Sequence, residues 1–401
     1  MRIVPLTALA VLAATTAHAK TIEVTAGDGA QQRLQEALIL AQPGDVVQIG
    51  EGRFALTDGL SLDASGVTVR GAGMAATVLD FSGQQGAGEG LLVTGDDVTL
   101  RDFAVENPKG DAIKSKGADR IVYHRVRTTW TGGPKETNGA YGIYPVESTG
   151  VLIDGVQVEG ASDAGIYVGQ SKDITIRNSV AQGNVAEIEI ENSRNAIVRG
   201  NLATRNTGGI LVFDLPNLPV MGGGNVLVED NLVVANDTPN FAPKGNIVAA
   251  VRRGTGVMVM ANDGVTVRGN RIDGNPTSGV MVINYPRSFT DKTYNPSPRR
   301  VTIGDNGFGR NGYAPQIDGA PMLLQAFGGE LPPVLWDGLG APAATIAAAQ
   351  GVRAWSLNLP AQGADPASAK PAPVTLPLIA KQARAVMPTG APSDLDKRLM
   401  Q

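Results

Sequence analysis

The chain has 401 residues with a formal net charge of −4, and 51 residues are glycine, well above the usual share of roughly 7 %. Collagen is excluded because no Gly-X-Y period appears, and a helical bundle is disfavoured because glycine costs about 1 kcal/mol at each helix-interior position. Cysteine is absent, which excludes disulfides and thiolate sites, and a mildly acidic chain is a poor nucleic-acid binder.

The N-terminus predicts a secretory signal peptide at residues 1–19. Met1 and Arg2 precede an apolar run over residues 3–14, and an A-x-A-like cleavage sequence ends at Ala19. The run is too short to span a bilayer, which needs about 20 apolar residues, so the protein is not expected to be membrane-embedded. We therefore expect a periplasmic or secreted protein, in which His124 is the only remaining histidine.

Residues 31–42 predict an amphipathic helix. Leu34, Ala37, Leu38 and Ala41 recur at helical spacing, and Pro43-Gly44 ends the pattern. A helix in this position could cover an open end of the repeat that follows.

A short alternating segment, followed by Gly, Asp or Asn and a turn, recurs along the chain. Successive copies begin 22 to 39 residues apart, which fits a unit of about 22 residues with insertions. The copies begin at Val67, Val98, Ile121, Val151, Ile174, Ala196, Val226, Val265 and Val301.

A second segment, usually after glycine, lies inside each copy. Two or three short strands in about 22 residues predict one coil of a parallel β-helix, in which alternate side chains fill a continuous core. Asn201, Asn231, Asn270 and Asn306 recur after the first strand, where we expect left-handed corner residues whose side chains form a hydrogen-bonded ladder. The predicted domains are the all-β solenoid with its N-terminal cap at 20–312, an irregular C-terminal cap at 313–340 and an Ala/Pro-rich, partly disordered tail at 341–401.

Six stretches carry a family resemblance: residues 130–134, 139–145, 161–171, 189–192, 208–214 and 240–246. They resemble the right-handed parallel β-helix proteins of the pectate-lyase-like superfamily, and more closely a group of exported bacterial β-helix repeat proteins. The resemblance covers residues 21–320 and implies the fold and a cleft that binds extended polysaccharides, but no settled reaction.

Function is expected on the outer face of the second strand, because side chains fill the interior of a β-helix. Insertions at 130–138, 215–224, 235–253 and 285–299 are expected to form walls beside this face. Candidate binding residues are Lys114 and Lys116 for carboxylates, Tyr144 and Tyr167 for stacking on sugar rings, and Phe213. Together with Met258 and Met260, Phe213 forms an apolar end of the face that would suit a protein partner.

Three glutamates on one strand, Glu187, Glu189 and Glu191, are the candidate catalytic residues. Same-face neighbours lie about 6.6 Å apart at Cβ, near the roughly 6.5–9.5 Å carboxyl spacing of inverting glycosidases. Mutual repulsion should raise at least one pKa and so place an acid beside a base. Two alternatives stay open, a Ca²⁺ site and a solvated acidic face; no other cofactor is expected.

His124 is expected at the surface of the first strand, in a column with several arginines that we interpret as solvated charge. Arg287, Arg299 and Arg300 are weak candidates for a lyase-type arginine. The Gly-His-Gly and Asp-Pro-His-Asp signatures of polygalacturonases and alginate epimerases are absent. The leading hypothesis is a protein that binds a polysaccharide or oligosaccharide and, if it is an enzyme, acts as a lyase, glycoside hydrolase or epimerase. The alternative is a non-catalytic scaffold or maturation protein that docks a periplasmic partner.

Overall fold

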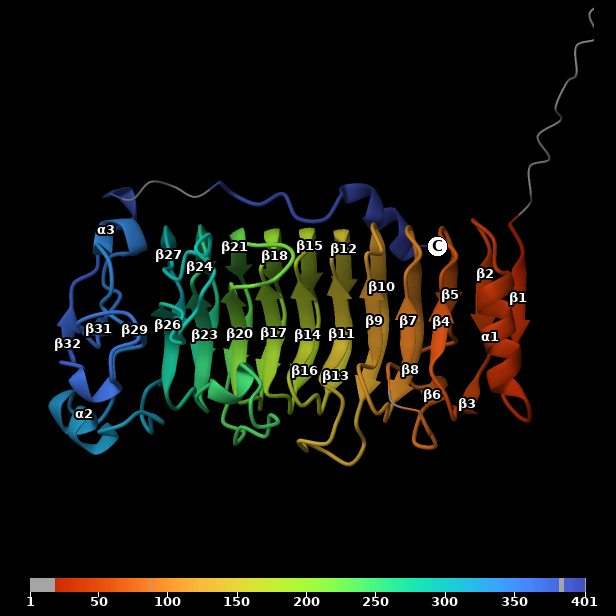
Figure 1. Cartoon of the computed structure of the whole chain (residues 1–401), viewed down its shortest axis with the longest axis horizontal. Helices are drawn as coiled ribbons and strands as arrows, with labels where there is room; N and C mark the ends of the chain where they lie inside the picture. Colours follow the sequence, from red (N-terminus) through yellow and green to blue (C-terminus); the bar gives the residue numbers. More distant parts are fainter. Residues whose placement is uncertain (1–18, 87, 382–385, 401) are drawn as a thin grey trace, which may run out of the picture.

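Three short strands repeat along the chain, and each pairs in parallel with the equivalent strand of the next coil, as expected for a right-handed β-helix (Figure 1). The computed structural model describes residues 19–86, 88–381 and 386–400. All of the expected signal peptide except Ala19 therefore lies outside the described residues. The parallel pairing of equivalent strands in successive coils confirms the predicted all-β, parallel β-helix fold class.

The coils build two sheets, which we call A and B. Sheet B contains β4 (Leu60–Leu62), β7 (Leu91–Val93), β9 (Ile113–Lys116), β11 (Tyr141–Val146), β14 (Ala164–Gly169), β17 (Ala186–Glu191), β20 (Gly208–Phe213), β23 (Thr255–Met260), β26 (Ser278–Ile283), β29 (Val334–Trp336) and β31 (Ala354–Ser356), with β32 (Ala372–Val374) antiparallel at its end.

Sheet A has two limbs joined by the long strands β8 (Thr99–Glu106) and β10 (Ile121–Thr129). The first limb contains β1 (Thr21–Val24), β2 (Val46–Ile49), β5 (Thr68–Arg70), β12 (Thr149–Asp154), β15 (Lys172–Arg177), β18 (Arg194–Arg199), β21 (Gly224–Glu229), β24 (Val265–Arg268), β27 (Val301–Ile303) and β30 (Ile346–Ala348). The second limb contains β3 (Gly52–Ala55), β6 (Thr77–Asp80), β13 (Gln157–Glu159), β16 (Val180–Gln182), β19 (Leu202–Thr204), β22 (Leu232–Val234), β25 (Arg271–Asp273) and β28 (Gly307–Phe308).

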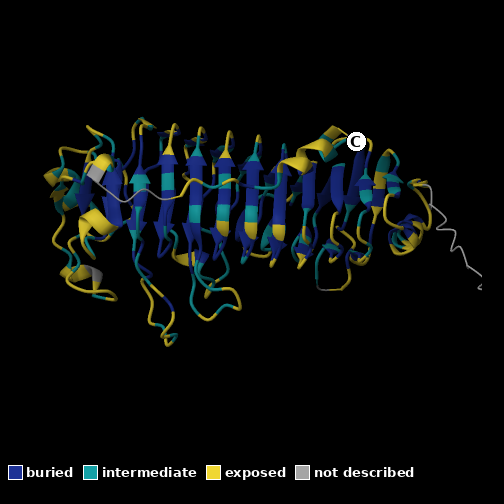
Figure 2. Cartoon of the chain, turned by 90° about the horizontal axis from the view of Figure 1, so that it is seen from above, coloured by how far each residue is buried: buried dark blue, intermediate teal, exposed yellow. Residues whose placement is uncertain are grey.

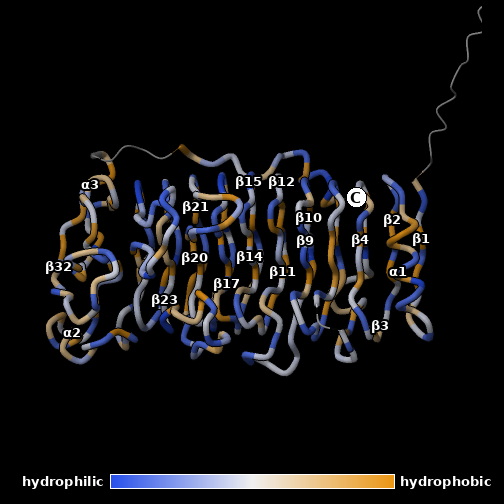
Figure 3. Tube along the Cα trace, in the orientation of Figure 1, coloured by the Kyte–Doolittle hydropathy of each residue, from blue (hydrophilic) through white to orange (hydrophobic). Residues whose placement is uncertain are grey.

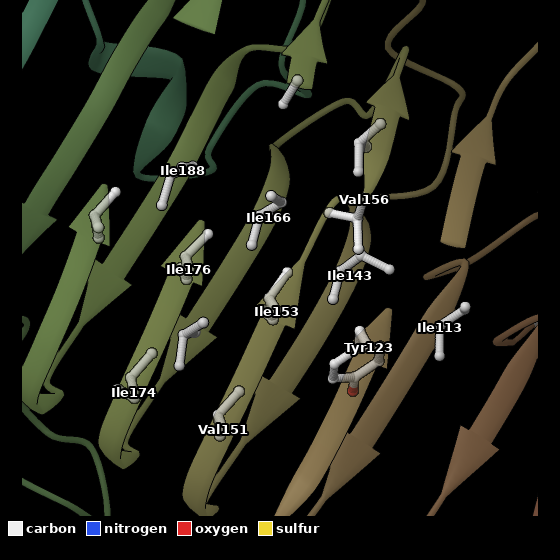
Figure 4. Close-up of a cluster of buried hydrophobic side chains, with 14 of the residues drawn as sticks. Ile113, Tyr123, Ile143, Val151, Ile153, Val156, Ile166, Ile174, Ile176 and Ile188 are labelled. Carbon is white, nitrogen blue, oxygen red and sulfur yellow. The ribbon is translucent and has the colours of Figure 1, made fainter. Parts of the chain in front are cut away.

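The core is a stack of β-branched side chains from both sheets (Figure 4). On sheet B, Ile143, Ile166 and Ile188 occupy equivalent positions of successive coils and are fully buried. Apolar residues alternate with polar ones along strands such as β15 and β24, and Figure 3 shows hydrophobic and hydrophilic positions interspersed along the whole solenoid. Identical stacking lets each coil bury its apolar side chains against the next coil.

Two asparagine ladders run up the inside corners of the coils. In the expected ladder, the Asn231 amide nitrogen donates to Asn270 Oδ1 at 2.9 Å, and Asn201 donates to Asn231 Oδ1 at 3.0 Å. The expected left-handed conformation was wrong for these asparagines: the residue before three of them, Gly200, Asp230 and Gly269, adopts it instead. A second ladder, missed in the sequence, joins Asn184, Asn206, Asn236, Asn275 and Asn311.

Helix α1 (Ala30–Leu40) lies at the N-terminal end, with Leu34, Ala37 and Leu38 buried as predicted. At the other end lie α2 (Ala320–Ala326), α3 (Pro342–Thr345) and the 3₁₀ turns η2 (Pro366–Ser368) and η3 (Ile379–Lys381), whereas the 3₁₀ turn η1 (Val248–Ala250) belongs to the insertion between β22 and β23. Coiling continues past residue 340, because β30 pairs with β27 and β31 pairs with β29. The predicted domain boundaries stay a prediction.

The C-terminal segment at residues 386–400, which ends in η4 (Ser393–Met400), runs back along the outside of sheet A (Figures 1 and 2). Arg398 donates to the Thr99 hydroxyl at 2.7 Å, and Leu395 packs on Val122 and Leu152. Residues almost 300 positions apart therefore contact each other. We call this segment the C-terminal strap.

Candidate functional site

The outer face of sheet B changes in character along the helix axis. Polar and aromatic side chains cover β9, β11, β14 and β17, whereas apolar side chains cover β20, β23 and β26. Register places Tyr167 beside Glu189, and Glu189 beside Leu211 of the next coil. Glu189 therefore stands at the boundary between the two halves of the face.

Three tyrosines form one aromatic cluster on the polar half. The ring of Tyr141 lies 4.5 Å from that of Tyr144 and 4.6 Å from that of Tyr167, measured between centroids. Tyr144 and Tyr167 meet edge to face at 4.8 Å, an arrangement that aromatic pairs favour. Tyr144 and Tyr141 are half-buried, so part of each ring can be reached from outside, whereas Tyr167 is buried. Tyr141 was missed in the sequence because it lies at the start of its strand.

Tyr167 folds along its own strand to reach a carboxylate on the next coil. Its hydroxyl donates to Glu191 Oε1 at 2.8 Å. This path crosses Gly169, where a Cβ atom would lie only 2.2 Å from the Tyr167 hydroxyl. Gly169 is therefore required for the contact. The stretch of glycine, aromatic and acidic residues was visible in the sequence, but the cross-coil contact was not.

Three buried carboxyl groups surround this contact: Asp163, Glu189 and Glu191. Burial, reinforced by the charge of Glu191, raises the pKa of Asp163 to about 7. Burial raises the pKa of Glu191 to about 7 although the Tyr167 hydrogen bond opposes the shift. The pKa of Glu189 is raised well above its usual value, first by burial and then by the two neighbouring acids. Near neutral pH the cluster can therefore both donate and accept protons.

The three-glutamate face predicted from the sequence was wrong for Glu187. Its register position lies between Gly165 and Gly209, and Cβ atoms on those glycines would point inward, at Ala181 and at Val233. Glu187 is fully buried, and its pKa is raised by burial alone, without a contribution from the other acids. The strand bends at its start, so strict alternation fails there. Glu187 faces the interior.

Glu189 and Glu191, the two glutamates that remain on the outer face, are also less exposed than expected. Glu189 and Glu191 are 2 % and 7 % exposed, so the interpretation as a solvated acidic face was wrong. Glu189 Oε1 is buried without a hydrogen-bond partner among the described residues. Asp163, which sequence reasoning missed, takes the place of Glu187 in the cluster. The sequence clue to Asp163 was its place directly before Ala164, the first residue of β14.

Lys114 is already paired within the protein. Its ammonium lies 3.1 Å from Glu89 and 3.6 Å from Asp111, and 4.8 Å from the centre of the Tyr144 ring. The predicted role of binding a ligand carboxylate therefore suits Lys116 better, because Lys116 is exposed at the end of the same strand. Burial raises the pKa of Asp111 to about 6, which extends the row of titratable carboxyl groups toward β9.

An elongated cavity of about 540 Å³ lies over the apolar half of the face. Its floor is formed by the outward side chains of β20, β23 and β26, and Glu189 lines its polar end. Its walls come from the insertions 235–253 and 285–299, from α2 and from the segment that follows β31. Principal apolar lining residues are Leu211, Phe213, Ile247, Val251, Met258, Met260, Met281, Ile283, Leu323, Leu335, Leu357 and Leu359.

The insertions and the C-terminal cap cover the apolar end that the sequence analysis expected to be exposed. Phe213, Met258 and Met260 are only 3 %, 8 % and 4 % exposed. A surface of exposed apolar residues for a protein partner is therefore absent from this part of the described chain. The sequence did carry a signal, because the runs Ile210–Phe213 and Val257–Met260 are apolar without alternation, which is typical of strands covered on both faces.

His124 lies on the opposite side of the coils, beneath the C-terminal strap, and is 8 % exposed rather than on the free surface as expected. Its Nδ1 atom is 3.8 Å from Asp154, and burial lowers its pKa. The neighbouring arginine column is largely paired with acids: Arg177 contacts Asp154 and lies 2.6 Å from Asp396 of the strap. The expectation of simple solvated charge was wrong for this part of the column.

Within the described ranges, no three acidic or histidine side chains are placed to hold a metal ion, and no helix has the length and apolar character needed to cross a membrane. The three glutamates offered as an alternative Ca²⁺ site are divided between the interior and the outer face. The expectation of no cofactor stays a prediction, and Ca²⁺ stays an alternative to it.

A model of the right handed beta helix region matches residues 65–290, more than half of the chain. The chain belongs to the right-handed β-helix family. The matched β-helix region contains the tyrosine cluster, the three carboxyl groups and most of the cavity floor. No match was found among curated proteins.

Solved β-helix structures support the same fold. The A-module of mannuronan C-5 epimerase AlgE4 from Azotobacter vinelandii is 18 % identical, with a TM-score of 0.54 over 80 % of this chain and 81 % of that one. The catalytic unit of an α-1,3-glucanase from Streptomyces thermodiastaticus is 16 % identical, with a TM-score of 0.53 over 82 % and 52 %. DFA-IIIase from Arthrobacter chlorophenolicus is 11 % identical, with a TM-score of 0.51 over 82 % and 98 %. At these identities the likeness shows the fold.

Proposed function

We propose that this protein binds a polysaccharide or oligosaccharide on the polar half of sheet B and modifies it by acid–base chemistry. The observation that carries the proposal is the contact between the tyrosine cluster and the buried carboxyl groups, made by the Tyr167 hydroxyl on Glu191. Aromatic faces beside carboxyl groups suit a ligand with apolar ring faces and many hydroxyl groups. The fold agrees, because the similar β-helix structures include enzymes whose names place them on carbohydrates.

Binding would use the half-buried Tyr144 ring and the exposed Lys116 at one end of the face. A polymer crossing successive coils would then meet Tyr141 before it reaches Glu191. Because coils stack about 4.8 Å apart, one sugar unit would extend over roughly one coil. Lys114 would hold Tyr144 in place, since its ammonium lies between that ring and two carboxylates.

Chemistry would use Asp163 and Glu191, whose pKa values of about 7 suit proton transfer near neutral pH. One carboxylate would remove a proton from the sugar or from a water molecule. The other carboxyl group would protonate the leaving oxygen in lysis or hydrolysis, or the sugar carbon in epimerisation. Tyr167 would act as a positioning residue, because its raised pKa keeps the hydroxyl protonated and donating to Glu191. This pair serves lysis, hydrolysis and epimerisation equally well, so the reaction class is left to experiment.

The test is a screen of the purified protein against acidic and neutral glycans for binding, new reducing ends, new double bonds and changed stereochemistry. We expect at least one glycan to bind and to be modified. Glu191→Gln and Asp163→Asn should abolish turnover but keep binding, whereas Glu23→Gln, on an exposed position of β1, should behave like the parent protein. Full turnover in Glu191→Gln would contradict the catalytic assignment, and a protein that binds no glycan would contradict the function.

We further propose that the protein acts in the periplasm or outside the cell, as the N-terminal sequence suggests. Fractionation of cells that express the full chain tests this, with Edman sequencing of the exported product. Cleavage after Ala19 is the expected result, and a product that stays with the cytoplasm would contradict it.

A further inference from the structure

The apolar cavity and the carboxyl cluster lie on one continuous face. Glu189 belongs to both, because it lines the cavity and because its pKa is raised by burial and then by the charges of Asp163 and Glu191. Along the stack the order is Tyr167, Glu189, Leu211 and Met258, each beside the next. A ligand that follows the helix axis therefore passes from an aromatic and acidic surface into an apolar chamber.

The chamber is built from side chains that saccharides do not favour. Methionines from two coils, Met258 and Met281, lie side by side on its floor, and Leu323 and Leu357 close it from above. Methionine adapts its shape to flexible apolar ligands. A volume of about 540 Å³ is in the range of small-molecule sites. A plain sugar chain would leave its hydroxyl groups unpaired there, at a cost for each group.

Two buried polar atoms in the cavity lining have no hydrogen-bond partner within the described part of the chain. They are Glu189 Oε1 and Oδ1 of Asn284, which is 7 % exposed. Burial raises the pKa of Glu189 and so favours its protonated form, which can donate a hydrogen bond to a neutral oxygen at the polar end of the chamber. A ligand oxygen placed where a sugar joins an aliphatic group would satisfy this carboxyl group.

We propose that the ligand is amphiphilic: a saccharide that carries an aliphatic chain, with the chain in the cavity and the sugar over the tyrosine cluster. The inference rests on the proposed function for its saccharide part, whereas the aliphatic part rests on the cavity alone. Glu189 lies where the sugar would join the aliphatic chain. Exposed Arg252 and Arg287 line the cavity rim beside Asp318 and Asp365, so the rim carries both signs of charge and does not select an anionic lipid.

The experiment titrates the full chain with alkyl β-D-glucosides and alkyl β-D-glucuronides of increasing chain length, below their micelle concentrations, and with octanoate. Affinity for the glycosides should rise by about fourfold per added methylene until the cavity is filled, as burial of a methylene group predicts. Saturation-transfer NMR should show the alkyl protons and the sugar protons both in contact with the protein.

Two independent filling variants test the position of the chain. Met281→Trp on the floor and Leu323→Trp on the wall should each remove the dependence on chain length, whereas Ile39→Trp, on an exposed position of α1, should retain it. Tyr144→Ala should weaken at least one glycoside series by the same factor at every chain length and leave octanoate binding unchanged. Thermal unfolding confirms that each variant is folded.

The outcomes separate this inference from the proposed function. A glycan that binds without any gain from an alkyl chain would overturn the amphiphile and leave the proposed function standing. Chain-length dependence that survives both filling variants would also overturn it, because the chain would then bind elsewhere. Octanoate binding with no contribution from any sugar, together with a negative glycan screen, would overturn the saccharide part of both proposals.

Discussion

Tyr167 donates its hydroxyl hydrogen to Glu191 at 2.8 Å by lying across Gly169, so one aromatic side chain joins two coils of the β-helix. The bond favours the ionised form of Glu191 and works against the effect of burial. Removing the hydroxyl while keeping the ring should therefore raise the pKa of Glu191 further. In Tyr167→Phe, we expect a carboxyl resonance that titrates at higher pH, followed by NMR of selectively labelled glutamate. An unchanged titration would show that the hydrogen bond does not control this acid.

Gly169→Ala tests the same contact by sterics. The new Cβ would lie 2.2 Å from the Tyr167 hydroxyl, so the ring must move and the bond to Glu191 must break. We expect a loss of about 1–3 kcal/mol in the free energy of unfolding, typical of an overpacked site, and a rise in the pKa of Glu191. Gly307→Ala is the control, because a Cβ there meets nothing closer than 3.8 Å. Equal effects of the two variants in urea unfolding would contradict the steric argument.

Stability should fall as the pH rises from about 4 to about 7. Glu191 binds its proton more tightly in the folded state, where its pKa is about 7, than in the unfolded chain, where it is about 4.3. Between these values the unfolded state binds fewer protons, so stability decreases with pH by up to about 1.4 kcal/mol per unit. Glu191→Gln removes the contribution of this group to the pH dependence.

The measurement is urea unfolding of the parent protein and Glu191→Gln at pH 5 and pH 8. The free energy of unfolding of Glu191→Gln minus that of the parent protein should be larger at pH 8 than at pH 5. Glu23→Gln should show no such gain. A pH-independent difference between the parent and Glu191→Gln would mean that the folded and unfolded pKa values of Glu191 are equal.

Glu187 offers a contrasting prediction, because it faces the interior and neither of its oxygens has a hydrogen-bond partner among the residues that the structure describes. Glu187→Met replaces a buried carboxyl group by an apolar side chain of similar length. We expect stabilisation by about 1–3 kcal/mol at pH 8, since an unpaired buried polar group is costly, and unchanged glycan turnover. Lost turnover in a folded variant would restore Glu187 to the catalytic group.

The asparagine ladders should be costly to interrupt. Asn231 donates to the Val198 carbonyl and to Asn270, and its Oδ1 accepts from the backbone and the side chain of Asn201. Asn231→Ala leaves these buried groups unsatisfied, so we expect a loss of 3 kcal/mol or more, at about 1–3 kcal/mol for each unpaired group. Asn246→Ala, outside both ladders and at a position without a positive φ, should change the unfolding midpoint little. Calorimetry of both variants provides the comparison.

Much of the fold could be predicted from the sequence because stacking repeats the same constraint in every coil. The inward residues Ile166, Ile188 and Ile210, the expected asparagine ladder and the capping helix all follow from local periodicity. The bend at the start of β17 could not be predicted from alternation alone. Glycines at the equivalent positions, Gly165 and Gly209, were the available clue, since a position that accepts only glycine in most coils is a crowded interior one.

The site was only partly predictable. Tyr144, Tyr167, Glu189 and Glu191 were correctly placed on one outer face, because alternation determines which side of a strand each residue occupies. Their burial depends on insertions whose paths are not periodic. Asp163 lies just outside the strand pattern, and the pairing of Ala164 with Tyr141 brings its carboxylate to 3.4 Å from the Tyr141 hydroxyl.

The C-terminal strap changes how a molecule of this type can unfold. A solenoid whose units contact only their neighbours can fray from either end, one coil at a time. Here Arg398 contacts Thr99 and Asp394 lies 2.5 Å from Arg120, so the strap is bound to the coils that contain residues 99 and 120. The coils between are enclosed in a loop of nearly 300 residues. Their separation requires the strap to detach first, which converts a chain of local transitions into a single cooperative one.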